Sequence, residues 1–129
     1  MSHPSWEILI VDDEAPLLKL MSVYLRRLGY TAFAANTMEK AWAHLKRHPE
    51  RIAAVVLDAG MADSGIDELA LDLLAFNPQL RVLVSSGYPV DMRVLQQAAS
   101  GRVEFLHKPF SPDMLVAALR RILGPQEEV

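Results

Sequence analysis

The chain has 129 residues and a mass of 14.4 kDa, the size of one domain that can bury its own core. Hydrophobic residues make up 51% and charged residues 22%, which argues against disorder, and the net charge of -3 does not suggest a general nucleic-acid surface. There is no cysteine, no signal-peptide pattern and no apolar run longer than six residues, so we expect one soluble, cytoplasmic domain without disulfides or a membrane span.

Strand-like apolar runs alternate with helix-like segments five times along the chain. The runs cover residues 6–11, 30–35, 52–57, 80–84 and 103–106. The first and third are almost continuously apolar, which is typical of strands buried on both faces of a parallel sheet.

Capping signals delimit the helices between these runs. Pro16 suits the first turn of the first helix and Gly29 its end, Asn36 or Thr37 can cap the second, and Ser111 precedes the last. The expected apolar face of the first helix consists of Leu17, Met21, Tyr24 and Leu28.

Five strand–helix units predict an α/β fold, a doubly wound parallel sheet with helices on both faces. In such folds ligands bind outside the carboxyl ends of the strands. The polar residues at those ends are Asp12, Asp13, Asp58, Ser85, Ser86 and Lys108. Singly, each is most often a turn or surface residue, but together they place three acids, hydroxyls and an amine at one edge of the sheet.

Clustered carboxylates need a proton or a cation, because each pair at 4 Å repels by about 4 kcal/mol at an effective dielectric constant near 20. Oxygen-only ligands favour Mg²⁺, which can neutralise the oxygens of a phosphoryl group. Lys108 and Ser86 could then contact other phosphoryl oxygens, which leaves Asp58 as the nucleophile that forms an aspartyl-phosphate.

Four motifs in this order resemble those of the receiver domains of two-component response regulators: residues 8–14 (ILIVDDE), 55–58 (VVLD), 83–88 (LVSSGY) and 108–110 (KPF). The resemblance covers residues 6–124 and implies a single receiver domain over 1–129, with a flavodoxin-like sheet of order 2-1-3-4-5. The Ser-Gly-Tyr step is also similar to receivers attached to hybrid sensor kinases.

The resemblance implies a role for each site residue. Asp58 would accept phosphate from the phosphohistidine of a histidine kinase or phosphotransfer protein, and the chain would catalyse only its own phosphorylation and slow dephosphorylation. The implied Mg²⁺ ligands are Asp13, Asp12 through water, Asp58 and the backbone carbonyl of Gly60. The other implied residues are Lys108 with a cis bond to Pro109, the switch residues Ser86 and Phe105, and the phosphate neighbours Gly87 and Tyr88. The output partner would bind the face of the fourth helix, fifth strand and fifth helix, without direct contact to nucleic acid or membrane.

The chain departs from the family pattern near the phosphate site. Ala62 stands where the family has Pro, and Gly65 comes one residue early after Asp58. Gly60 cannot orient an attacking water and Tyr88 could shield the site, so we expect slow self-dephosphorylation. The weak pattern of residues 89–100 predicts a short fourth helix.

Three other functions remain open at this point. A pseudo-receiver would bind partners without phosphorylation. A flavin carrier is disfavoured, because acids follow the first strand where a phosphate would lie. A phosphohydrolase of the haloacid-dehalogenase class would need Asp-x-Asp there. No role is expected for His107, and His44 and His48, at i,i+4, are expected on a solvated helix face.

Overall fold

The computed structural model describes residues 7–124 and contains the predicted alternation of strands and helices. The elements in chain order are β1 (Glu7–Val11), α1 (Ala15–Arg27), β2 (Thr31–Ala35), α2 (Met38–Arg47), β3 (Ile52–Asp58), the 3₁₀ helix η1 (Ala59–Met61), α3 (Ile66–Phe76), β4 (Arg81–Ser86), α4 (Arg93–Ala98), β5 (Val103–His107) and α5 (Pro112–Leu123). The strands form one parallel sheet of order β2-β1-β3-β4-β5, which confirms the predicted topology. The fourth helix is short, as expected.

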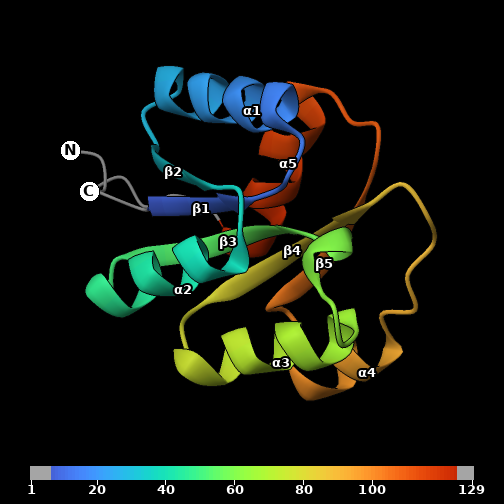
Figure 1. Cartoon of the computed structure of the whole chain (residues 1–129). Helices are drawn as coiled ribbons and strands as arrows, with labels where there is room; N and C mark the ends of the chain where they lie inside the picture. The colour runs from blue at the N-terminus through green and yellow to red at the C-terminus, as the bar shows by residue number, and fades with distance from the viewer. Residues whose placement is uncertain (1–6, 125–129) are drawn as a thin grey trace.

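Two apolar cores lie on opposite faces of this sheet. Figure 1 shows α1 and α5 on one face and α2, α3 and α4 on the other. Successive side chains of a strand point to opposite faces, so β1 supplies Ile8 and Ile10 to the first core and Leu9 and Val11 to the second. All five residues of β1 are buried, Glu7 included, and burial on both faces explains the apolar run of residues 8–11.

The predicted helix caps are present. The Thr37 hydroxyl accepts a hydrogen bond from the Lys40 amide at 3.1 Å, which selects Thr37 over Asn36 as the cap of α2. The Ser111 hydroxyl accepts one from the Met114 amide at 3.1 Å. Gly29 follows α1 with φ at 96°, a conformation that favours glycine.

The predicted apolar face of α1 was partly wrong. Met21 is buried, and Leu17 and Tyr24 are partly buried against the same core, but Leu28 is 45% exposed. The centre of the buried face consists of Leu18, Met21, Ser22 and Leu25. Leucines at both 17 and 18 satisfy the same helical period, so the sequence leaves the rotation of the helix open. Packing of α1 against the sheet and α5 decides it.

The expectation that His44 lies on a solvated face was also wrong. His44 is buried on α2, and its Nε2 lies 2.5 Å from Oε2 of Glu7 at the start of β1, which is buried as well. The Phe33 ring stacks on the imidazole with a centroid separation of 3.7 Å. The polar partner is 37 residues away in sequence, so the helical pattern of α2 could not reveal it.

Among residues 7–124, no helix combines the length and the apolar character needed to cross a membrane.

Candidate functional site

The candidate site lies at the carboxyl edge of the sheet, where the strand ends gather the predicted polar residues. Asp12 follows β1, Asp58 ends β3, Ser86 ends β4 and Lys108 follows β5. The Lys108 amide donates to the Ser86 carbonyl at 2.8 Å and so joins the ends of the last two strands. Because all strands are parallel, their carboxyl ends share one edge, as the sequence predicted.

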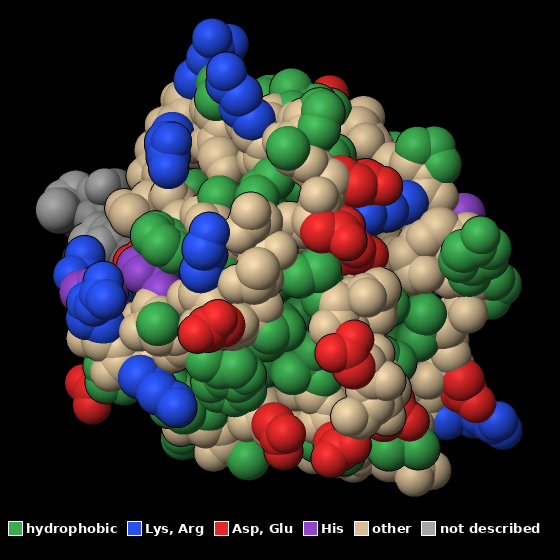
Figure 2. Space-filling view, in the orientation of Figure 1, with side chains coloured by type: hydrophobic (Ala, Val, Ile, Leu, Met, Phe, Trp, Pro, Cys, Tyr) green, Lys and Arg blue, Asp and Glu red, His purple; other side chains and the backbone are tan. Residues whose placement is uncertain are grey.

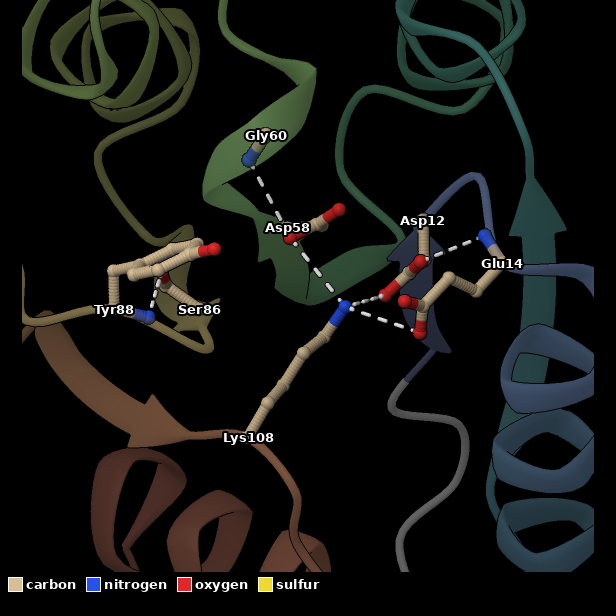
Figure 3. Close-up of polar contacts among 7 residues, drawn as sticks. All are labelled: Asp12, Glu14, Asp58, Gly60, Ser86, Tyr88 and Lys108. Carbon is tan, nitrogen blue, oxygen red and sulfur yellow. Dashed lines mark hydrogen bonds and ion pairs between the residues drawn. The ribbon is translucent and has the colours of Figure 1, made fainter.

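The Lys108 ammonium lies at the centre of this site (Figure 3). Its Nζ is 2.9 Å from Oδ2 of Asp12, 3.5 Å from Oδ1 of Asp58 and 3.5 Å from Oε1 of Glu14. Burial alone would lower the pKa of Lys108, but its hydrogen bond to Asp12 and the charges of the three carboxylates raise the pKa overall. The side chain is therefore held as a cation against the acids.

Asp58 is crowded by negative charge. Its side chain is only 13% exposed, and its Oδ1 accepts a hydrogen bond from the Gly60 amide at 3.4 Å. Burial and the neighbouring Asp12 raise the pKa of Asp58, and they outweigh the opposite effects of Lys108 and the Gly60 amide. The charged form of Asp58 is therefore destabilised first by its burial and then by Asp12, and Lys108 offsets only part of this.

Three carboxylates in this site suit a hard divalent cation. Asp12, Asp13 and Asp58 each offer an oxygen, and these oxygens all lie within 4.8 Å of one another. Asp12 is fully buried, whereas Asp13 is exposed, so the cluster opens to solvent on one side. An all-oxygen donor set with an open side fits Mg²⁺, which keeps several of its waters. The participation of the Gly60 carbonyl stays a prediction.

A depression of about 700 Å³ opens above Asp58. Its lining includes Gly60, Ser86, Gly87, Tyr88, Lys108 and Pro109. The Ser86 hydroxyl accepts a hydrogen bond from the Tyr88 amide at 3.0 Å, and Figure 3 shows the Tyr88 ring next to Ser86. Tyr88 is 80% exposed. The bond between Lys108 and Pro109 is cis, as predicted.

Two further residues considered from the sequence, Ser85 and Phe105, are not among the lining residues of this depression. Ser85 is buried, and alternation along β4 directs it to the sheet face opposite that of Ser86. Phe105 packs partly buried against the core under α3 and α4, and it pairs in register with Val84, while Ser86 pairs with His107. The switch roles of Ser86 and Phe105 stay predictions.

One site residue had no role assigned from the sequence. Glu14 donates its backbone amide to Oδ1 of Asp12 at 2.9 Å, and its carboxylate faces Lys108. It also lines the depression. In the sequence Glu14 is visible only as the third acid of the Asp12-Asp13-Glu14 run. The structure shows that its carboxylate contacts the same Lys108 ammonium as Asp12 does.

Comparison with known proteins gives the class of this chain. The family model of the response regulator receiver domain matches residues 8–120, so the chain belongs to this family, whose members serve two-component signalling. It is 32% identical over 126 residues to the transcriptional regulatory protein ZraR of Escherichia coli O157:H7, and 33% identical over 120 residues to the phosphate regulon transcriptional regulatory protein PhoB of Pseudomonas aeruginosa. These matches cover 96% and 90% of this chain, but it spans only 28% of the former relative and 51% of the latter.

Solved receiver structures share the fold. A CheY-like receiver domain protein from Methanospirillum hungatei JF-1 superposes with a TM-score of 0.79 at 23% identity, covering 93% of this chain and 94% of that one. The BeF3-activated DrrB receiver domain gives 0.72 at 29% identity, covering 93% and 98%. A Burkholderia pseudomallei response regulator solved with a phosphorylated aspartic acid, calcium ion and citrate gives 0.72 at 24% identity, covering 88% and 66%.

Proposed function

We propose that this chain accepts a phosphoryl group on Asp58 from the phosphohistidine of a histidine kinase or histidine phosphotransfer protein, in a reaction that requires Mg²⁺. The proposal rests on one observation: Lys108 lies 3.5 Å from Asp58 inside an acidic cluster that opens into a depression. The chain would act as a signalling module in the cytoplasm, with its own Asp58 as the only substrate.

The residues of the site account for the transfer. A carboxylate oxygen of Asp58 attacks phosphorus, the N–P bond of the phosphohistidine breaks, and its electron pair returns to the imidazole nitrogen. Lys108 exchanges its contacts with the acids for a phosphoryl oxygen, and the Ser86 hydroxyl donates a hydrogen bond to another. A divalent ion held by Asp12, Asp13 and Asp58 would supply charge neutralisation for the phosphoryl oxygens.

The output would follow from rearrangement around the new charge. The aspartyl-phosphate places a phosphoryl group with roughly two negative charges beside Ser86, in place of the single charge of the Asp58 carboxylate. If Ser86 turns towards them, its hydrogen bond with the Tyr88 amide breaks. The loop after β4 and Phe105 on β5 would then repack, which changes the face formed by α4, β5 and α5 for a protein partner.

We also propose that the phosphorylated state is long-lived. Gly60 offers no side chain to orient a water towards the phosphoryl group, and Tyr88 lines the depression beside Ser86, where its ring could shield the phosphoryl group. Both features reduce productive access of water to the reacting phosphorus.

Intact-mass measurement tests the phosphotransfer directly. The protein is incubated with acetyl phosphate, with Mg²⁺ or with EDTA, and compared with Asp58→Asn and with Asp63→Asn, a control in the same loop. We expect one phosphoryl group on the wild type and on Asp63→Asn only with Mg²⁺, and none on Asp58→Asn. Absence of Mg²⁺-dependent phosphate on the wild type would refute the proposal.

A further inference from the structure

A second depression lies between α2 and α3, next to the loop that follows Asp58. Its volume is about 210 Å³, below the usual 300–1,000 Å³ of small-molecule pockets, so its size suits an inserted side chain. We call it the α2–α3 groove; its lining consists of Met38, Met61, Ala62, Asp63, Ser64, Gly65, Glu68, Leu69 and Asp72.

The floor of the groove is apolar and adaptable. Met38, Met61 and Leu69 are partly buried and pack on the core beneath α2 and α3. Methionine is unbranched and polarisable, and methionine-rich surfaces accommodate side chains of varied shape. Figure 2 shows hydrophobic side chains on this face between α2 and α3, with acidic side chains around them.

The rim of the groove carries uncompensated negative charge. Asp63, Glu68 and Asp72 are exposed, and within residues 7–124 none of them takes part in an ion pair or a side-chain hydrogen bond. No lysine or arginine of the described residues lines the groove, and Lys40 on α2 lines a separate depression beside Asp13. A bound segment could place an apolar side chain on the apolar floor of the groove and neighbouring Lys or Arg side chains against its acidic rim.

From this combination we infer that the α2–α3 groove docks a basic amphipathic helical segment of a partner protein, which inserts an apolar side chain between Met38, Met61 and Leu69 and places Lys or Arg against the acidic rim. This is helix-in-groove recognition, with the anchors supplied by one face of the partner helix. The groove is distinct from the α4, β5 and α5 face proposed above for the output.

The groove shares a short segment of chain with Asp58. Met61 ends η1, whose Gly60 amide bonds to the Asp58 carboxylate. A change at Asp58 therefore displaces one wall of the groove, and occupancy of the groove acts back on Asp58, because coupling between two sites is reciprocal. This coupling, unlike the docking itself, rests on the proposed phosphorylation.

Amide chemical-shift mapping on the full chain with Mg²⁺ present tests the docking. The probe is an amphipathic Leu/Lys peptide of about five helical turns, about 18 residues, and the control peptide has Glu in place of Lys. We expect shifts at Met38, Met61 and Leu69 with the Lys peptide only. Shifts confined to the Asp58 depression or to the α4, β5 and α5 face, or none at all, would overturn the inference.

Matched charge variants separate a specific groove from general attraction to an acidic protein. Glu68→Gln with Asp72→Asn removes two rim charges from exposed positions and is expected to weaken the Lys peptide roughly threefold to tenfold. Glu50→Gln with Asp91→Asn removes the same net charge elsewhere and should leave the affinity near that of the wild type. If both pairs of substitutions weaken binding equally, docking in the groove is refuted. Docking of a partner protein is also refuted if the wild type self-associates with increasing concentration and the rim variant does not, because the occupant of the groove is then a second copy of this chain.

The coupling is tested by repeating the titration after treatment with acetyl phosphate. On protein shown by mass to carry phosphate, we expect the affinity to change at least about twofold, with no change in Asp58→Asn. Unchanged affinity on phosphorylated protein overturns the coupling, whereas absence of phosphate in the mass spectrum is the separate failure of the proposed function.

Discussion

Replacing Asp58 with Asn should stabilise the protein in the absence of divalent ions, although it removes the proposed phosphoacceptor. Asp58 pays an electrostatic penalty, because burial and Asp12 raise the pKa of its carboxyl above the usual value. The amide of Asn has nearly the same shape but no charge, so it removes the repulsion with little change in packing.

The distances in the site set the size of this effect. At an effective dielectric constant near 20, charges 4.8 Å apart, the upper limit within the acidic cluster, interact by about 3.5 kcal/mol, and charges 3.5 Å apart by about 4.7 kcal/mol. With both distances at this upper limit, the repulsion of Asp58 by Asp12 and Asp13 exceeds its attraction to Lys108 by at least about 2 kcal/mol before screening. Asp13 is exposed and partly screened, so we expect a gain of about 1–2 kcal/mol in the free energy of unfolding.

Thermal unfolding in EDTA at pH 7 measures this gain, and about 4 °C per kcal/mol is expected for a domain of this size. Asp63→Asn, which removes an exposed carboxylate without an ion pair in the described residues, should leave Tm nearly unchanged. Because the folded pKa of Asp58 is raised, the folded state binds a proton more readily than the unfolded state, so wild type and variant should converge as pH falls through that pKa. An Asp58→Asn Tm equal to or below that of the wild type would refute the electrostatic argument.

Further predictions concern the metal, the phosphate lifetime and the buried pair. Millimolar Mg²⁺ should raise the Tm of the wild type and much less that of Asp13→Asn; equal shifts would place the ion elsewhere. Gly60→Asn should accelerate loss of phosphate by up to about tenfold, which corresponds to an activation free energy lower by about 1.4 kcal/mol. The added Cβ would lie 3.4 Å from Asp58 Oδ2, so the new side chain is placed to orient a water at the phosphoryl group. A slower loss of phosphate in the mass assay contradicts the water-access argument. His44→Ala should lower the free energy of unfolding in urea by about 3 kcal/mol, because it leaves the Glu7 carboxylate buried without a partner, and Glu7→Gln should cost less; equal losses would show that charge is not the cause.

Much of the fold was predictable because it follows from local patterns that packing does not alter. The continuous apolar runs that became β1 and β3 are buried on both faces, and Thr37 and Ser111 cap their helices through bonds to amides three residues on. Once strands and helices alternate, the handedness of the crossovers leaves few topologies. The gathering of Asp12, Asp58 and Lys108 at one edge then follows from the parallel sheet itself.

Features that depend on packing between distant segments were missed or predicted wrongly. The sequence shows the helical spacing of apolar residues in α1. It does not show which side of the helix faces the core, because the adjacent Leu17 and Leu18 allow two rotations of the helix. His44 resembled a solvated helix residue until β1 placed Glu7 beside it. Glu14 was visible as an acid of the first motif, and only its 3.5 Å distance to Lys108 gives it a part in the site.

The modest net charge of -3 says little about function, and the distribution of charge decides more. The sequence by itself determined the order of the elements, the receiver motifs and the edge of the sheet at which three acids and a lysine meet, since these depend on spacing along the chain. Only the tertiary structure decided which acid holds Lys108 most closely, which helix face is buried and where the α2–α3 groove forms. These depend on through-space distance and on exclusion of water, which residues far apart in the chain create together.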